Sequence, residues 1–154
     1  MNPLVQVSAV VAIALGAALA TYWVKGPPDR AVACDPAKLQ SDEVCLERVL
    51  GEWKGRVLWI DARPRGEWES NGMTGSLLWN IDTHENMQAF EAETAGRMLE
   101  GMRVVVYCSN ENCGVSRQVA GQIKALQLGN EVWVLYGGWR ALAAAKLTKD
   151  QNRK

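Results

Sequence analysis

Two cysteines, Cys108 and Cys113, stand at either end of a short polar stretch within YCSNENCGVSRQVAG, residues 107–121. The apolar run before Cys108 is typical of a buried strand, and the residues after Cys113 are typical of a helix. A thiol near a helix N-terminus lies close to free backbone N–H groups, which stabilise a thiolate. Cys108 is therefore predicted to be a nucleophile that needs no histidine partner. The alternative is a buried strand-end thiol with no chemical role.

Cys113 admits three interpretations. It could form a disulfide with Cys108 and so resolve an oxidised or sulfur-loaded form, because loops of this size bring two Cα atoms within bonding range. It could itself be the nucleophile, since it stands nearer the helix N-terminus. It could also be a filler beneath the loop. Two charged residues bear on the site: Arg117 could add positive charge, and Glu111 inside the loop works against it.

The elements that would position these thiols alternate along the chain. Strands are expected at residues 56–63, 76–81, 103–108 and 131–136, and helices at about 42–53, 64–70, 84–100, 116–127 and 139–146, with Ser41 as the N-cap of the first helix. Strands that alternate with helices predict an α/β fold, a small parallel β-sheet flanked by helices on both faces. Functional groups in such sheets collect at the carboxyl ends of the strands, which is where Cys108 stands.

Asp61 and Arg63 also stand at a predicted strand end. They could be catalytic, but a structural ion pair that holds the neighbouring loops is the favoured interpretation. Gly137 and Gly138 are expected to serve a backbone turn.

The N-terminus predicts a membrane segment. Residues 4–24 form a nearly continuous apolar run, and no charged side chain occurs before Lys25. This run is long enough to span a bilayer as a helix, and Tyr22 and Trp23 would sit at the interface. The alternatives are a signal peptide cleaved after the ALA of residues 18–20 and a buried core helix. The predicted organisation is an anchor or signal segment at 1–25, a linker at 26–40, a folded domain at 41–147 and a polar tail at 148–154.

The side of the membrane is indicated by two opposing signals. Positive residues follow the span and none precedes it, which favours a cytoplasmic domain. Cys34 and Cys45 are close enough in sequence to form a disulfide, which suits an oxidising compartment. The alternative for this pair is one surface thiol and one buried thiol. The prediction is a single-pass membrane protein with its domain on the extracytoplasmic, periplasmic side.

The composition excludes some classes of function. Lys plus Arg and Asp plus Glu both number 17, so no basic surface for nucleic acid is expected. The chain has one histidine and no C-x-x-C, which disfavours a zinc site. No metal and no organic cofactor are implied, and the oligomeric state is left open.

Four ordered segments resemble the rhodanese-like sulfurtransferases over residues 41–146. LWIDARPRGEW is similar to the family's early strand with Asp-x-Arg. NGMTGSLLWNI stands at the place of its Gly-His-Ile-Pro-Gly-Ala segment, VVVYCSNENCGVSRQVA resembles its active-site strand, loop and helix, and VWVLYGGWRAL resembles its closing Gly-Gly-Trp segment. The resemblance implies a rhodanese-like fold.

The resemblance also implies a reaction. Cys108 would take sulfane sulfur from a donor such as thiosulfate as a persulfide, and pass it to a small acceptor of the cyanide type or to a protein thiol. The loop backbone would cradle that sulfur; the residues concerned are Ser109, Asn110, Glu111, Asn112, Gly114, Val115, Ser116 and Arg117. Two departures stand out: Met73 and Thr74 replace the family's histidine segment, and Ser116-Arg117 come later and in reversed order, so the loop is about two residues longer.

Two other functions remain open. A thiol redox or sensing protein would use the Cys108–Cys113 pair. A non-catalytic interaction module would present the fold to a membrane partner, and Glu111 within the loop favours that alternative. A plain C-x5-R phosphatase or arsenate-reductase loop is excluded, because counting back from Arg117 reaches Glu111.

Overall fold

The computed structural model describes residues 32–109 and 114–149, together with helical positions 6, 10, 13, 14 and 16. Most of the predicted membrane segment, residues 4–24, lies outside this part of the chain. Among the described residues, no helix is both long and apolar enough to cross a bilayer. Ala31–Lys154 forms one compact unit and Met1–Arg30 another.

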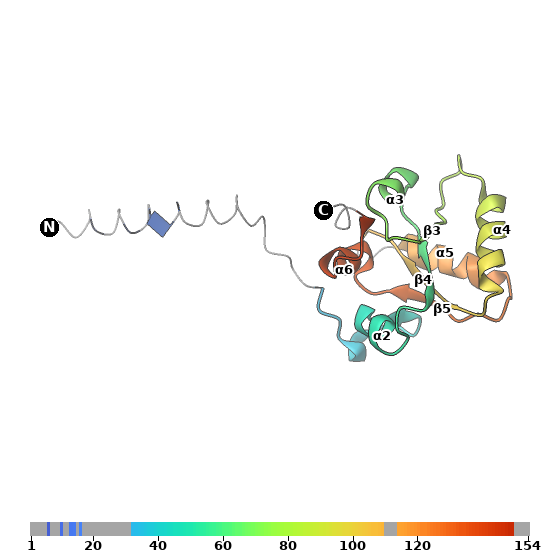
Figure 1. Ribbon diagram of the computed structural model, residues 1–154, viewed down its shortest axis with the longest axis horizontal. Coiled ribbons are helices and arrows are strands. Elements are labelled where there is room, and N and C mark those ends of the chain that lie inside the picture. The colour runs from blue at the N-terminus through green and yellow to red at the C-terminus, as the bar shows by residue number, and fades with distance from the viewer. Residues whose placement is uncertain are drawn as a thin grey trace. The chain divides into compact units, whose positions relative to one another are not determined.

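One parallel sheet of five strands forms the centre of the larger unit (Figure 1). The strands are β1 (Glu43–Val44), β2 (Val57–Asp61), β3 (Leu77–Leu78), β4 (Arg103–Tyr107) and β5 (Val132–Leu135), in the order β1-β5-β4-β2-β3. The middle strand is β4, in which Val106 pairs with Ile60 on one side and with Val134 on the other. The predicted parallel α/β sheet is confirmed.

Helices cover both faces of this sheet. After the short 3-10 helix η1 (Pro36–Lys38) come α2 (Leu46–Gly51), α3 (Arg65–Asn71), α4 (Met87–Met98), α5 (Gly114–Ala125) and α6 (Gly138–Ala144). Val104 and Val106 pack with α4 and α5 on one face. Val105 and Tyr107 pack with α2 and α6 on the other. This alternation follows from the two-residue period of a strand, so the unbroken apolar run of β4 reflects burial on both faces.

The start of the domain differs from the prediction. A helix was expected from residue 42 with Ser41 as its N-cap, but residues 43–44 form the edge strand β1, and α2 begins only at Leu46 with Cys45 as its N-cap. The reason is tertiary: Glu43 pairs with Val134 and Val44 with Leu135 of β5. Two residues are too few to show a strand period in the sequence.

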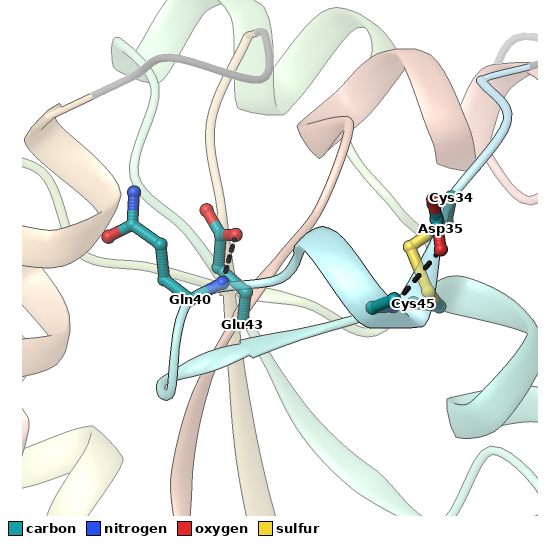
Figure 2. The surroundings of a disulfide bond; sticks show 6 residues. Cys34, Asp35, Gln40, Glu43 and Cys45 are labelled. Atoms are coloured by element: carbon teal, nitrogen blue, oxygen red, sulfur yellow. Dashed lines mark hydrogen bonds between the residues drawn. A yellow bond between two sulfur atoms is a disulfide. The ribbon is translucent and has the colours of Figure 1, made fainter.

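A disulfide joins Cys34 to Cys45, with Cα atoms 5.7 Å apart (Figure 2). Beside it, Asp35 caps η1 through the Ala37 N–H at 3.0 Å. Two residues before Cys34, Val32 lies over Gly137, where a Cβ would come within 2.5 Å of the Val32 Cγ1. Gly137 also has a φ of 78°, so both the close approach and the backbone favour glycine there. Part of the predicted linker is therefore folded against the domain.

A buried polar network stands at the carboxyl end of β4. Tyr107 is fully buried, and its hydroxyl donates to Asp61 Oδ2 at 2.7 Å and accepts the Met73 N–H at 2.9 Å. The Ser76 hydroxyl oxygen lies 3.2 Å from the Tyr107 hydroxyl oxygen. Burial, and then the charge of Asp61, raise the pKa of Tyr107 above its ordinary value. We call Tyr107, Asp61, Arg63, Met73 and Ser76 the Tyr107 network; it joins β2, β4 and the turn that follows α3.

The predicted polar tail begins inside the fold. Thr148 is 1% exposed and forms an antiparallel bridge with Met73. Lys149 donates its ammonium N–H to the Trp68 carbonyl at 2.8 Å and stands 4.4 Å from the centre of the Trp68 ring. These contacts hold residues 148–149 against α3 and the turn after it.

We predict that the Cys34–Cys45 disulfide stabilises the domain by about 2–3 kcal/mol, because it closes a short loop in the unfolded chain. Urea unfolding of Cys34→Ser, Cys45→Ser and the double variant would measure this. Each single change should lose nearly as much as the double change, since either one abolishes the bond. Small, additive losses would contradict the prediction.

We also predict that Tyr107→Phe lowers the free energy of unfolding by about 1–3 kcal/mol at neutral pH. It leaves the half-buried Met73 N–H without its partner and removes one of the hydrogen bonds that the buried Asp61 carboxylate receives, although Arg63 still pairs with that carboxylate. Tyr136→Phe is the matched control, because the Tyr136 side chain is only half-buried and makes no hydrogen bond among the described residues. The raised pKa of Tyr107 adds a pH dependence, because the unfolded tyrosine ionises first. The wild-type advantage should be fully present below about pH 10 and shrink above it. An advantage that stays constant to high pH would count against this assignment.

Candidate functional site

Cys108 directly follows β4 at the carboxyl edge of the sheet. Its side chain is 2% exposed and packs in the same apolar cluster as α4 and α5. Its carbonyl accepts the backbone N–H of Trp139, in the first turn of α6, at 2.6 Å. The thiol position is therefore set on the α5 side of the sheet, while the backbone is held from the α6 side.

The first turn of α5 lies next to the sulfur. Ser116 is 2% exposed, and its Oγ is 3.6 Å from the Cys108 Sγ. With 12 residues, α5 is long enough to present a positive N-terminal end, and its first-turn N–H groups have no partners within the helix. This geometry suits negative charge on the sulfur.

Cys108 is disulfide-bonded, and none of the described cysteines is free. The predicted loop residues Asn110, Glu111 and Asn112, and Cys113 itself, lie outside the described residues. Of the other loop positions, Ser109 and Gly114 are exposed and Val115 is half-buried against the core. The structure thus brings Cys108 and Ser116 together from the predicted set.

Arg117 does not stand near the site as an unpaired positive charge. Its guanidinium Nη2 donates to the carboxylate of Glu43 in β1, which is 7% exposed. The other carboxylate oxygen of Glu43 accepts the Gln40 N–H at 3.0 Å, as Figure 2 shows. The Nε of Arg117 is buried and has no hydrogen-bond partner among the described residues. The ion pair offsets most of the charge that Arg117 was expected to add, so the helix N-terminus is the main electrostatic influence among the described groups.

Asp61 and Arg63 form a buried ion pair, with Arg63 Nη2 2.8 Å from Asp61 Oδ2. Arg63 also donates to Glu67 at 3.2 Å and to the side-chain oxygen of Asn71 at 2.9 Å. Burial by itself would lower the pKa of Arg63, but the hydrogen bond and charge of Asp61 raise it above the ordinary value. The partners of the pair are all parts of the fold, which favours the structural interpretation.

Among the described residues, one group of side chains has the types that bind metals. Cys34, Cys45 and Glu47 bring potential ligand atoms within 4.8 Å of one another. Both sulfurs are engaged in the disulfide, so they are not available as thiolate ligands. The donor set does not fit a resident metal in this oxidised form.

Three residues around Cys108 were not singled out from the sequence. Glu43 gave no signal, because an acidic residue in the first turn of a predicted helix is ordinary. Tyr107 was not distinguished in the sequence from the apolar strand residues before it. Trp139 was part of the Gly-Gly-Trp segment, but only the tertiary structure places its N–H on the Cys108 carbonyl.

Comparison with known protein families matches residues 48–145 to the rhodanese-like domain. Among solved structures, a rhodanese-like domain from Anabaena sp. aligns with a TM-score of 0.52 and 16% identity, over 71% of this chain and 80% of that chain. An As-Sb reductase from Leishmania major aligns with a TM-score of 0.52 and 18% identity, over 69% and 83%. A 3-mercaptopyruvate sulfurtransferase from the same organism has a TM-score of 0.48 and 17% identity, over 70% of this chain and 36% of that one. A comparison with curated proteins gave no significant match.

At these identities the solved structures show the fold alone. The family match spans well over half of the chain and includes β2, β4, Cys108 and α5. It confirms the family that the four sequence segments indicated. The chain belongs to the rhodanese-like domain family.

Proposed function

We propose that the chain is a sulfurtransferase whose nucleophile is Cys108. The observation that carries this proposal is the position of its sulfur, at the carboxyl end of the central strand and 3.6 Å from the Ser116 hydroxyl in the first turn of α5. Ligand sites of open parallel sheets lie at this edge. A reduced Cys108 would be held as a thiolate by the helix N-terminus and by the Ser116 hydroxyl, without a histidine.

The proposed reaction has two steps. The Cys108 thiolate attacks the outer sulfur of thiosulfate, the sulfur–sulfur bond of the donor breaks, and sulfite leaves with the electron pair. The cysteine is then a persulfide, with its negative charge on the terminal sulfur. An acceptor such as cyanide or a thiolate attacks that sulfur, the Cys108 S–S bond breaks, and the Cys108 thiolate is restored. No external oxidant or reductant is consumed in this cycle.

The surroundings of Cys108 support the first step. The persulfide adds a charged sulfur beside Ser116 and the α5 N-terminus, which are the groups among the described residues that can stabilise it. The backbone of the exposed residues Ser109 and Gly114 would complete the cradle together with the predicted loop residues Asn110, Glu111 and Asn112. Because the Glu43 pair offsets the charge of Arg117, this cradle would rely on N–H groups more than on a cation.

We also propose that the domain works in an oxidising, extracytoplasmic compartment, anchored by residues 4–24. The Cys34–Cys45 disulfide supports this, because disulfides of this structural kind are rare in reducing compartments. It lies only ten residues beyond the end of the apolar run. A substrate would then be a small sulfur compound or a protein thiol of that compartment.

Our test is the intact mass of the reduced chain after thiosulfate and then cyanide. Wild type should gain one sulfur atom that cyanide removes, Cys108→Ser should gain none, and Cys113→Ser should load like wild type. Cyanide removal is essential, because two added oxygen atoms weigh nearly the same as one sulfur atom. Loading that survives in Cys108→Ser but vanishes in Cys113→Ser would transfer the role to Cys113. No loading in any accessible, reduced sample would reject sulfur transfer from thiosulfate and leave the redox and interaction-module alternatives.

A thiol redox protein is the second candidate, and the disulfide-bonded state of Cys108 favours it. Cys34 and Cys45 are joined to each other, and the proposed partner of Cys108 in this candidate is Cys113, the other cysteine of the predicted pair. In the proposed step, two thiols lose two electrons and two protons to an external disulfide, which becomes two thiols. The same bond would block sulfur loading, since Cys108 must be a thiolate to attack a donor.

For this candidate we expect a reversible 108–113 disulfide. Its reduction potential should be less negative than that of the Cys34–Cys45 disulfide, so that weaker reductants break it. Peptide mapping after equilibration in thiol–disulfide buffers would measure both bonds in one sample, with Cys34–Cys45 as the internal control. Cys113→Ser should leave Cys108 open to alkylation in every buffer that oxidises wild type. A Cys108 that is alkylated equally in both proteins across the series would rule the pair out.

A further inference from the structure

Trp139 joins α6 to three separate parts of the fold around Cys108. Its backbone N–H donates to the Cys108 carbonyl at 2.6 Å. Its indole N–H donates to the carbonyl of Asn71, the last residue of α3, at 2.8 Å. Its ring centre lies 5.3 Å from the guanidinium carbon of Arg63. No other residue described around the strand end makes this combination of contacts.

The hydrogen bond from the Trp139 N–H to the Cys108 carbonyl pairs two backbone groups that have no partner within the sheet or within α6. The Cys108 carbonyl lies past the last residue of β4, where the parallel ladder has ended. The Trp139 N–H is in the first turn of α6, where a helix has no internal acceptor for it. The hydrogen bond therefore fixes the peptide plane of Cys108 at the point where its side chain leaves the backbone.

The other two contacts fix Trp139 itself. Arg63 is held by Asp61, Glu67 and Asn71, so the guanidinium beneath the indole ring is rigid. The indole N–H ties the start of α6 to the end of α3 through the Asn71 carbonyl. Together they transmit the rigidity of the buried Asp61–Arg63 pair to the backbone of Cys108, although neither charged residue hydrogen-bonds to Cys108.

We propose that Trp139 is a positioning residue for Cys108, whose indole holds the first turn of α6 so that its backbone N–H keeps the Cys108 sulfur aimed at the first turn of α5. This role rests on the proposed nucleophilic role of Cys108. When the indole anchor is lost, the Cys108 peptide rotates more freely and the sulfur spends less time beside Ser116 and the helix N-terminus. The thiolate then loses stabilisation and the productive direction of attack.

The test is Trp139→Phe in the full chain, which keeps an aromatic ring over Arg63 and removes the indole N–H. Iodoacetamide alkylation of Cys108 in the reduced protein, followed over a range of pH by fragment-resolved mass spectrometry, gives the thiol pKa. We expect this pKa to rise and the alkylation rate at neutral pH to fall about 3- to 10-fold, the effect of one hydrogen bond. Sulfur loading from thiosulfate should slow by a similar factor.

Trp68→Phe is the matched control, because it also removes an indole N–H, which the carbonyl and the hydroxyl of Ser76 share at 3.1 and 3.2 Å. No described hydrogen bond or ring contact joins Trp68 to Cys108 or Trp139. Trp68→Phe should lower the unfolding temperature to a similar extent and leave the pH profile of Cys108 unchanged. A lower unfolding temperature in Trp139→Phe with an unchanged pH profile and loading rate would overturn the proposal. If Trp139→Phe does not fold, the benzothienyl analogue of Trp139, which keeps the shape and lacks the N–H, replaces it.

The two readouts separate this proposal from the proposed function. Alkylation reports the environment of the Cys108 thiol whether or not the protein transfers sulfur. A pH profile that shifts in Trp139→Phe while wild type takes no sulfur from thiosulfate would support the positioning role and reject the tested sulfurtransferase reaction. Sulfur loading in wild type with an unshifted profile in Trp139→Phe would do the reverse.

Discussion

The buried ion pair between Asp61 and Arg63 is the constraint on which the carboxyl edge of the sheet depends. Removing two charges from water is costly, and the cost is offset only when their hydrogen-bonding groups are satisfied. Here nearly all of these groups have hydrogen-bond partners. Asp61 accepts hydrogen bonds from the Arg63 side chain, the Arg63 backbone N–H and the Tyr107 hydroxyl. Arg63 also donates to Glu67 and Asn71. These partners come from three separate segments of the chain, so the pair fixes the relative positions of β2, β4 and α3.

That rigidity matters because Cys108 stands immediately after Tyr107. A residue just past a strand end has lost its ladder partners, and its side chain would otherwise sample several directions. Two helices on opposite faces of the sheet restrain it. On one face, α5 brings Ser116 to the sulfur, and on the other, α6 brings the Trp139 N–H to the carbonyl. A cysteine held between two helices in this way suits either a persulfide nucleophile or one half of a redox pair, and its disulfide-bonded state makes the thiol chemistry conditional on reduction.

The edge strand β1 is secured in a different way. It is only two residues long and would be marginal as a strand alone. The Cys34–Cys45 disulfide holds the chain just after it, and the Glu43–Arg117 ion pair ties it to the first turn of α5. The β1 edge of the sheet is therefore coupled to the helix that faces Cys108. The same disulfide holds Val32 against Gly137, one residue before α6 begins.

The sequence by itself determined the order of the main strands and helices, the buried character of β4, the family and the cysteine at its strand end. These features depend on local periodicity and on short segments, which a single chain displays directly. It could not reveal β1, the partner of Arg117 or the contact between Trp139 and Cys108. Glu43 becomes a strand residue because β5 lies beside it, and Arg117 loses its expected role because that strand places a carboxylate next to it. Only the tertiary structure decided these points, since each depends on residues distant in sequence that meet once the sheet has formed.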